Sequence, residues 1–253
     1  MKHGKSVPLS LGRKMLIEHC HFSNATQKGV LKSRIKIAPL LMALGKAEAA
    51  GKKPKLALVF IKAFAVASQS IPELRRAYCK LPWPHFYELE HSVGILPITR
   101  DLDGEEIVMM AQFRDPAATT LSNLNDALHH MKTAPLRSIK SFDRALKVAA
   151  LPFPLRRLAF WLGLNFGRQH RKYFATFAVS AMGLVEPVYA IHPLPSLLTF
   201  GPLDFENTQV NLTLSFDHRV YDGMTAVRAF SAIEAALNGP IATELLLSAK
   251  QPV

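Results

Sequence analysis

A change of hydrophobic period close to the carboxyl end restricts the fold of this chain more than any other feature. Apolar residues first alternate with polar ones, at Val210, Leu212, Leu214 and Phe216. They then recur every three or four positions, at Val227, Phe230, Ile233 and Leu237. The first period predicts a half-buried strand, and the second predicts one face of a helix. His218 is therefore expected in a tight turn between a strand and a helix, with acidic residues at 217 and 222.

Hydrophobic spacing and turn residues predict further helices and strands along the chain. Strands are expected at 29–37, 86–98, 105–113 and 196–201. Helices are expected at 39–50, 56–68 and 116–131. Asn238-Gly239-Pro240 is expected to end the helix that follows the His218 turn. Asp103-Gly104 predicts a hairpin turn between two of the strands.

Residues 217–223 carry the clearest motif, which reads Asp-His-Arg-Val-Tyr-Asp-Gly. This segment resembles the active-site motif of the acyltransferase core of 2-oxo acid dehydrogenase complexes. Chloramphenicol acetyltransferase, in the same superfamily, carries a related His-x-x-x-Asp-Gly pattern. Residues 7–15 and 55–78 resemble two more stretches of the family, although Arg75 replaces a family asparagine.

The stretch 173–183 resembles the family strand that reads Gly-Thr-Phe-Thr-Ile-Ser-Asn-Leu-Gly. Ser180 falls in step with the family serine, whereas Ala181 replaces the asparagine. Residues 184–189 replace the glycine-rich loop that normally follows, and the segment from Ser180 to His218 is shorter than usual. The resemblance therefore implies a reshaped active-site rim.

The resemblance implies a single α/β domain over residues 1–253, with the chloramphenicol acetyltransferase-like mixed sheet and helices on one face. Only six residues precede Val7, so we expect neither a lipoyl domain nor a peripheral-subunit-binding domain. The family active site lies between subunits of a trimer, which implies a homotrimer here. The resemblance fails over residues 134–172, which form a divergent basic and apolar insert.

The resemblance also implies a reaction, the transfer of an acyl group between the thiols of coenzyme A and dihydrolipoamide. By this carry-over His218 is the base that makes the attacking thiolate. Ser180 is the donor to the tetrahedral oxyanion, and Asp222 holds the turn and polarises the site. We expect Arg219 to make a structural ion pair. Coenzyme A is expected as a substrate, with no metal and no lipoyl group of the chain's own.

A net charge of +12 limits the partners of this protein. Phosphates of coenzyme A, an acidic lipoyl or acyl carrier domain acting in trans, and an anionic membrane surface all suit a basic protein. No zinc-ligand spacing or nucleic-acid-binding motif is found, so nucleic acid is not expected. Two cysteines and no signal-peptide pattern favour a reducing, cytoplasmic location.

The segment 151–164 allows two interpretations. It is apolar and basic, but Pro152, Pro154, Arg156 and Arg157 interrupt it, so no membrane span is expected. The segment is either a helix packed on the core or at a subunit interface, or an interfacial helix on anionic lipid. The lipid interpretation makes a membrane-peripheral protein that keeps this fold one alternative to an acyltransferase. A non-catalytic trimeric scaffold is the other alternative.

Overall fold

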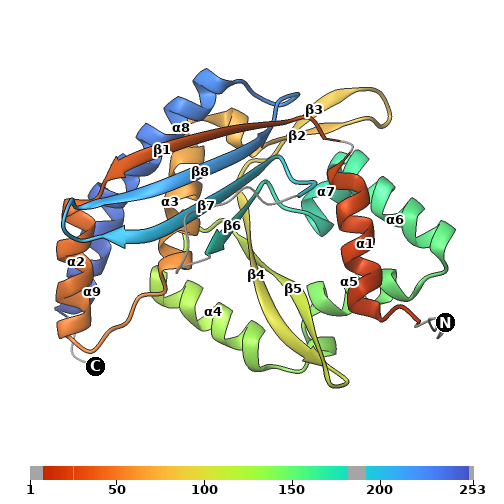
Figure 1. Ribbon diagram of the computed structural model, residues 1–253, viewed down its shortest axis with the longest axis horizontal. Helices are drawn as coiled ribbons and strands as arrows, with labels where there is room; N and C mark the ends of the chain where they lie inside the picture. Colours follow the sequence, from red (N-terminus) through yellow and green to blue (C-terminus); the bar gives the residue numbers. More distant parts are fainter. Residues whose placement is uncertain (1–7, 25, 182–191, 251–253) are drawn as a thin grey trace, which may run out of the picture.

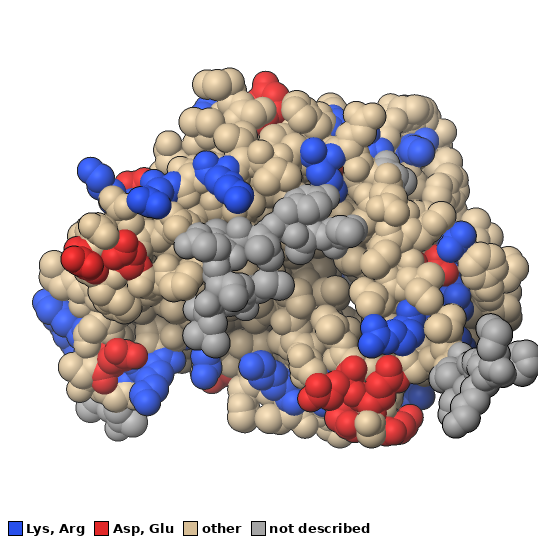
Figure 2. Space-filling view, in the orientation of Figure 1, with Lys and Arg blue, Asp and Glu red and all other residues tan. Residues whose placement is uncertain are grey.

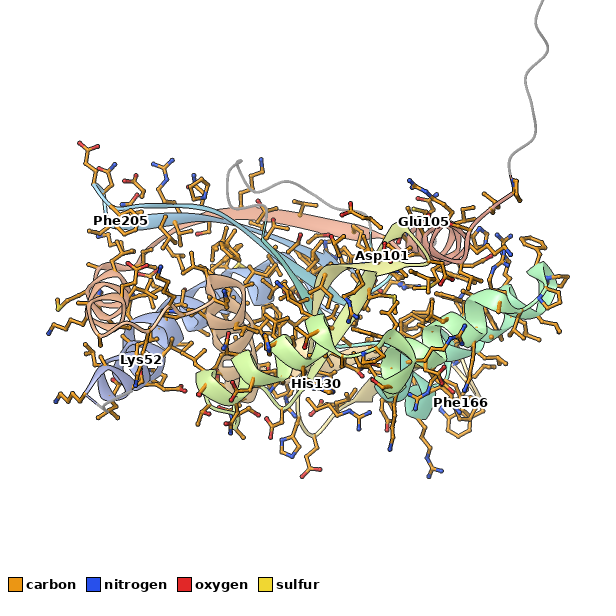
Figure 3. All side chains as sticks on the ribbon, turned by 90° about the horizontal axis from the view of Figure 1, so that it is seen from below. Lys52, Asp101, Glu105, His130, Phe166 and Phe205 are labelled. Carbon is orange, nitrogen blue, oxygen red and sulfur yellow. The ribbon has the colours of Figure 1, made fainter. Side chains whose placement is uncertain are left out.

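A six-stranded mixed sheet forms one layer of the protein and helices cover one of its faces (Figure 1, Figure 3). The computed structural model describes residues 8–24, 26–181 and 192–250. The sheet order is β1-β8-β7-β6-β4-β5, where β4, β6 and β7 are parallel neighbours and the other pairs are antiparallel. These observations confirm the predicted α/β fold with a mixed sheet.

The strands of the main sheet are β1 (Lys28–Lys36), β4 (Val93–Leu102), β5 (Glu105–Arg114), β6 (Phe177–Ala181), β7 (Ser196–Asp204) and β8 (Gln209–Asp217). A separate two-stranded sheet contains β2 (Arg76–Cys79) and β3 (His85–Glu88). The helices are α1 (Leu11–Ser23), α2 (Ala38–Ala49), α3 (Leu56–Ser70), α4 (Leu121–Thr133), α5 (Lys140–Ala150), α6 (Phe153–Asn165), α7 (Gly167–Tyr173), α8 (Gly223–Ala236) and α9 (Ala242–Ala249).

Helix α3 anchors the main core beneath the middle of the sheet. Phe60 and Phe64 of α3 are fully buried. Their rings stack on Phe200 of β7 and Phe177 of β6, at centroid distances of 4.0 and 4.2 Å. Aromatic pairs at this separation add to the energy of burial, so these contacts fix the helix against two neighbouring strands.

The hairpin and most elements lie where the sequence predicts them, with four corrections. Asp103 and Gly104 both have positive φ, at 55° and 83°, which is the geometry of a tight hairpin turn. The predicted strand 86–98 is wrong, because β3 and β4 are separate strands in different sheets. The predicted helix 116–131 begins only at Leu121, after the capping residue Thr120. The predicted strand 173–183 begins only at Phe177, because α7 extends to Tyr173.

The fourth correction concerns the end of the predicted helix that follows the His218 turn. Asn238-Gly239-Pro240 does not end the helical path, which continues through a π-helical turn at Leu237–Ile241 into α9. Leu237 and Ile241 are both fully buried. Their burial holds this turn on the core despite the proline. Residues 184–189, which replace the family loop, lie outside the described residues.

The divergent insert 134–172 folds into α5, α6 and α7, which lie beside α1 at one end of the sheet (Figure 1). The Glu18 carboxylate of α1 is fully buried and accepts from Nε of Arg156 at 3.2 Å and of Arg157 at 3.1 Å. The two arginines of the predicted basic and apolar segment are therefore bound within the protein. No helix of the described residues has the length and apolar character needed to cross a membrane.

Helix α6 leaves an apolar stripe on its outer side. Phe153, Leu155, Leu158, Leu162 and Phe166 are between 38% and 54% exposed. The last four recur at helical spacing and so share one face. These five residues are called the α6 stripe, and Phe153 at its start also contacts the Arg157 guanidinium, 4.5 Å from its ring centroid.

Candidate active site

The turn that carries His218 joins the end of β8 to the start of α8. Asp222 is the capping residue of α8, and its Oδ1 accepts from the Thr225 backbone N–H at 2.8 Å. This bond satisfies one of the free N–H groups at the helix start. The same hydrogen bond holds the pKa of the Asp222 carboxyl below its ordinary value. Asp222 therefore fixes where the turn ends.

Asp217 fixes the start of the turn through a two-point ion pair. Its Oδ1 accepts from Nε of Arg219 at 2.9 Å and its Oδ2 accepts from Nη2 at 2.6 Å. The Arg219 guanidinium also lies 4.8 Å from the ring centroid of Tyr78 in β2. Arg219 thus makes the structural ion pair expected from the sequence, and the pair spans the base of the turn.

His218 lies between these two anchors and is exposed. Its backbone N–H donates to the Gln27 carbonyl at 2.8 Å. Its ring lies 5.4 Å from the ring of Phe216, which in turn stacks on Tyr221 at 4.8 Å. The backbone of His218 is therefore held in place, and the rings of Phe216 and Tyr221 form an aromatic wall on one side of its imidazole. Because His218 is exposed, the imidazole can contact a second molecule at the surface.

Tyr221 and Ser196 tie the turn to the neighbouring strand β7. Their hydroxyl oxygens are 2.8 Å apart and form a buried hydrogen bond. Burial raises the pKa of the Tyr221 phenol, so this group stays protonated. Such a bond is costly to break because either hydroxyl would be left buried without a partner.

Ser180 lies on a different part of the sheet. In β6, Phe177 and Val179 belong to the main core under the helices, whereas Ala178 belongs to a smaller cluster on the opposite face. Side chains alternate along a strand, so Ser180 shares the open face with Ala178.

The basic residues are spread over the surface of the protein. Figure 2 shows Lys and Arg side chains scattered over the face of the molecule that it presents.

The strand register gives the separation of Ser180 and His218. Ser180 pairs with Thr199, and Thr199 pairs with Thr213 of β8. His218 follows Thr213 by five residues, which corresponds to roughly 17 Å along the strand, and two strand spacings add about 10 Å across the sheet. Ser180 and His218 of one chain therefore do not form a joint site.

Three basic residues near the turn were not singled out from the sequence. Lys28 is the cross-strand partner of Asp217, and its Nζ donates to the Leu194 carbonyl at 2.7 Å. Burial lowers the pKa of Lys28 to about 8 and that of His19 to about 4. His192 Nε2 lies 3.0 Å from Ser215 Oγ, and burial holds its pKa well below the ordinary value. No sequence motif connects these three residues, because only the fold brings their segments together.

Among the residues that the structure describes, no group of three or more His, Cys, Asp or Glu side chains could hold a metal ion. Within those residues, the chemistry of the turn is accordingly that of an imidazole, two carboxylates and a guanidinium.

The arrangement of sheet and helices is shared with acyltransferase cores. The dihydrolipoamide acetyltransferase of Azotobacter vinelandii aligns with a TM-score of 0.64 and 16% identity, over 96% of this chain and 95% of that one. The truncated catalytic core of the 2-oxoacid dehydrogenase multienzyme complex from Thermoplasma acidophilum aligns with a TM-score of 0.65 and 13% identity, over 94% and 99% of the chains.

Chloramphenicol acetyltransferase also shares the fold, with a TM-score of 0.50 and 14% identity over 87% of this chain and 94% of that one. The protein therefore has the chloramphenicol acetyltransferase-like fold of these acyltransferase cores, as the sequence predicts. No protein-family model and no curated protein sequence matches the chain. At these identities the likeness establishes the fold, and the function is argued from the site.

Proposed function

We propose that this protein is a coenzyme A-dependent acyltransferase in which His218 is the general base. The observation that carries the proposal is the His218 turn, where an exposed imidazole stands between an ion pair and a helix cap. The Azotobacter vinelandii enzyme uses a serine, a histidine and an asparagine in catalysis, and its histidine and asparagine are four residues apart. His218 and Asp222 have the same spacing here.

The proposed chemistry needs no cysteine nucleophile, because the acceptor brings its own thiol or hydroxyl. The neutral His218 imidazole removes the acceptor proton, and the resulting thiolate or alkoxide attacks the thioester carbonyl. The Ser180 hydroxyl donates to the tetrahedral oxyanion, and the loss of one such donor costs about 2.7–4 kcal/mol of barrier. The intermediate then expels the coenzyme A thiolate, which takes up the proton from the His218 imidazolium.

We further propose a homotrimer whose sites lie between subunits. The separation of Ser180 and His218 within one chain supports this arrangement. A lipoyl or acyl carrier domain acting in trans is the proposed acyl acceptor, since its acidic surface would complement the net charge of +12.

The test of the proposed function is acyl transfer from a panel of acyl-CoAs to dihydrolipoamide, carrier-bound thiols and small alcohols, followed by mass spectrometry. The His218→Ala protein should lose transfer by at least a hundredfold while it keeps its thermal midpoint and mass. His129→Ala, which changes an exposed histidine on α4, is the matched control. Transfer by His218→Ala within a few-fold of wild type would support the non-catalytic scaffold instead.

A membrane-peripheral role is the second candidate, and the exposed α6 stripe is the observation that favours it. The pairing of Arg156 and Arg157 with Glu18 weakens this candidate, because Arg156 is buried and the charge of both cations is partly balanced within the protein. A contact between subunits through the α6 stripe agrees better with the proposed trimer.

A further inference from the structure

Lys28 is a half-buried cation beside the His218 turn, and the proposed acyl-transfer chemistry does not use it. It is the first residue of β1 and the cross-strand partner of Asp217, the last residue of β8. Directly opposed residues of an antiparallel pair share one face of the sheet. The Lys28 side chain therefore stands beside the carboxylate that fixes the start of the turn.

Two backbone hydrogen bonds hold the turn from opposite sides, because β8 lies between β1 and β7. The N–H of His218 donates to the Gln27 carbonyl at the start of β1. The N–H of Asp217 donates to the Pro195 carbonyl just before β7, and both distances are 2.8 Å. The position of the turn therefore depends on how the start of β1 lies relative to the segment before β7.

Lys28 bridges these two segments. Its Nζ donates to the Leu194 carbonyl at 2.7 Å. Leu194 precedes Pro195 and Lys28 follows Gln27, so the bridge joins residues adjacent to both carbonyls that accept from the turn. A hydrogen bond from a charged donor is about twice as strong as a neutral one. The ammonium form of Lys28 therefore holds the two segments together more firmly than the amine.

The surroundings of Lys28 disfavour this charged form. The titratable and charged groups that face it among the described residues are His19 of α1, His192, Asp217 and Arg219. Burial lowers the pKa of both histidines, and Asp217 is bonded through both oxygens to Arg219. Burial therefore lowers the pKa of Lys28 to about 8, although Asp217 opposes part of the shift. Groups with shifted pKa values gather at functional sites, which supports a role for this cation beyond folding.

We propose that Lys28 is a positioning residue for His218, whose turn keeps the geometry needed for acyl transfer because the Lys28 ammonium bridges β1 to the segment before β7. This inference rests on the proposed function, since it takes His218 as the base. Lys28 acts on the backbone that holds the turn, and the acyl group is not its target. An ammonium loses its proton as the pH rises, so the bridge weakens and transfer becomes slower in alkaline solution.

The pH dependence of acyl transfer tests this role, with kcat measured at saturating acyl-CoA from about pH 7 to about pH 10. Wild-type kcat should fall as Lys28 loses its proton near pH 8. The free energy of unfolding should rise over the same range, because the unfolded chain still binds this proton. The fall in kcat would therefore not report unfolding.

Two substitutions separate the charge of Lys28 from its presence. Lys28→Met lacks the bridge, so its kcat should be about tenfold below wild type at neutral pH and should not decline near pH 8. Lys28→Arg stays charged, so it should keep most of the wild-type kcat and lose the decline. Lys32→Met, at an exposed position of β1, is the control and should keep the wild-type profile.

Hydrogen exchange of residues 215–221 gives a readout that needs no acyl transfer. At neutral pH, exchange there should be about tenfold faster in Lys28→Met than in wild type, whereas α3 should exchange equally in both. Unchanged exchange, an undiminished kcat in Lys28→Met, or a decline near pH 8 that persists in it would overturn the inference. The His218→Ala protein tests the proposed function separately, because retained transfer there removes His218 as the base whatever Lys28 does.

Discussion

Gly29 and Phe216 are cross-strand partners in β1 and β8, and a Cβ atom on Gly29 would lie 2.4 Å from Cζ of the Phe216 ring. The ring occupies the space that a side chain at position 29 would need. Phe216 also contacts the rings of His218 and Tyr221. The absence of one side chain on β1 thus positions the aromatic wall of the candidate active site.

Gly29→Ala should therefore displace Phe216 and the rings that depend on it. Overpacking of this kind costs about 1–3 kcal/mol of stability, and the proposed acyl transfer should fall because His218 loses its wall. Urea unfolding and the acyl-transfer assay measure the two effects. Gly45→Ala, where no atom lies within 4 Å of the added Cβ, is the control. A Gly29→Ala protein with unchanged stability would show that the ring moves aside without cost.

Lys28 should make stability depend on pH in the alkaline range. Burial lowers its pKa from 10.5 to about 8, and Asp217 opposes part of this shift. The unfolded chain then binds more protons than the folded one between about pH 8 and pH 10.5, so the free energy of unfolding rises with pH there. The rise is on the order of 1–3 kcal/mol, and Lys28→Met should remove it.

The comparison needs urea unfolding of wild type and Lys28→Met at several pH values from 7 to 10.5. Lys32→Met, at an exposed position of the same strand, should keep the wild-type slope. Equal slopes in wild type and Lys28→Met would mean that Lys28 is not desolvated by its surroundings.

Local sequence patterns predicted the parts of the fold that local interactions determine. The His218 turn, the Asp103-Gly104 hairpin and α3 depend on period and turn chemistry within a few residues. The break between β3 and β4 was not predictable in this way. β3 pairs with β2 in a separate sheet, and the Leu89 N–H donates to the Arg75 carbonyl, so contacts distant in sequence decide where the strand ends.

The same distinction applies to the candidate site. Asp217, His218 and Asp222 are close in sequence, so a motif could identify them. Arg156 was expected at a basic break in an apolar run, but its partner Glu18 lies 138 residues away. Lys28, His19 and His192 gave no signal, because only the fold brings their segments together near the turn.

The α6 stripe should not bind a membrane. Sedimentation with vesicles of phosphatidylserine and phosphatidylcholine should leave the protein in the supernatant, because Arg156 is buried and both Arg156 and Arg157 are paired with Glu18. Co-sedimentation of wild type that is lost in Leu158→Glu/Leu162→Glu would establish the membrane-peripheral role instead. Ser122→Glu/Asn125→Glu, at two exposed positions of α4, makes the same change in net charge and is the control.

Mixing two inactive proteins should restore activity if the site is shared between subunits. Ser180→Ala removes the oxyanion donor, and His218→Ala removes the base. In a mixed trimer, one interface combines the intact Ser180 of one chain with the intact His218 of the next. About three quarters of randomly assembled trimers are mixed and each has one such interface, so recovered activity should approach about a quarter of wild type.

The experiment is to refold the two variants together, verify the mixed trimers by native mass spectrometry, and compare transfer with each variant alone. Refolding each variant by itself controls for recovery during the procedure. Ser180 and His218 lie roughly 17 Å apart along the strands of one chain, which leaves a joint site within that chain without a geometric basis. Verified mixed trimers with no gain in activity would therefore remove Ser180 from the site, while the loss of activity in His218→Ala would still identify the base.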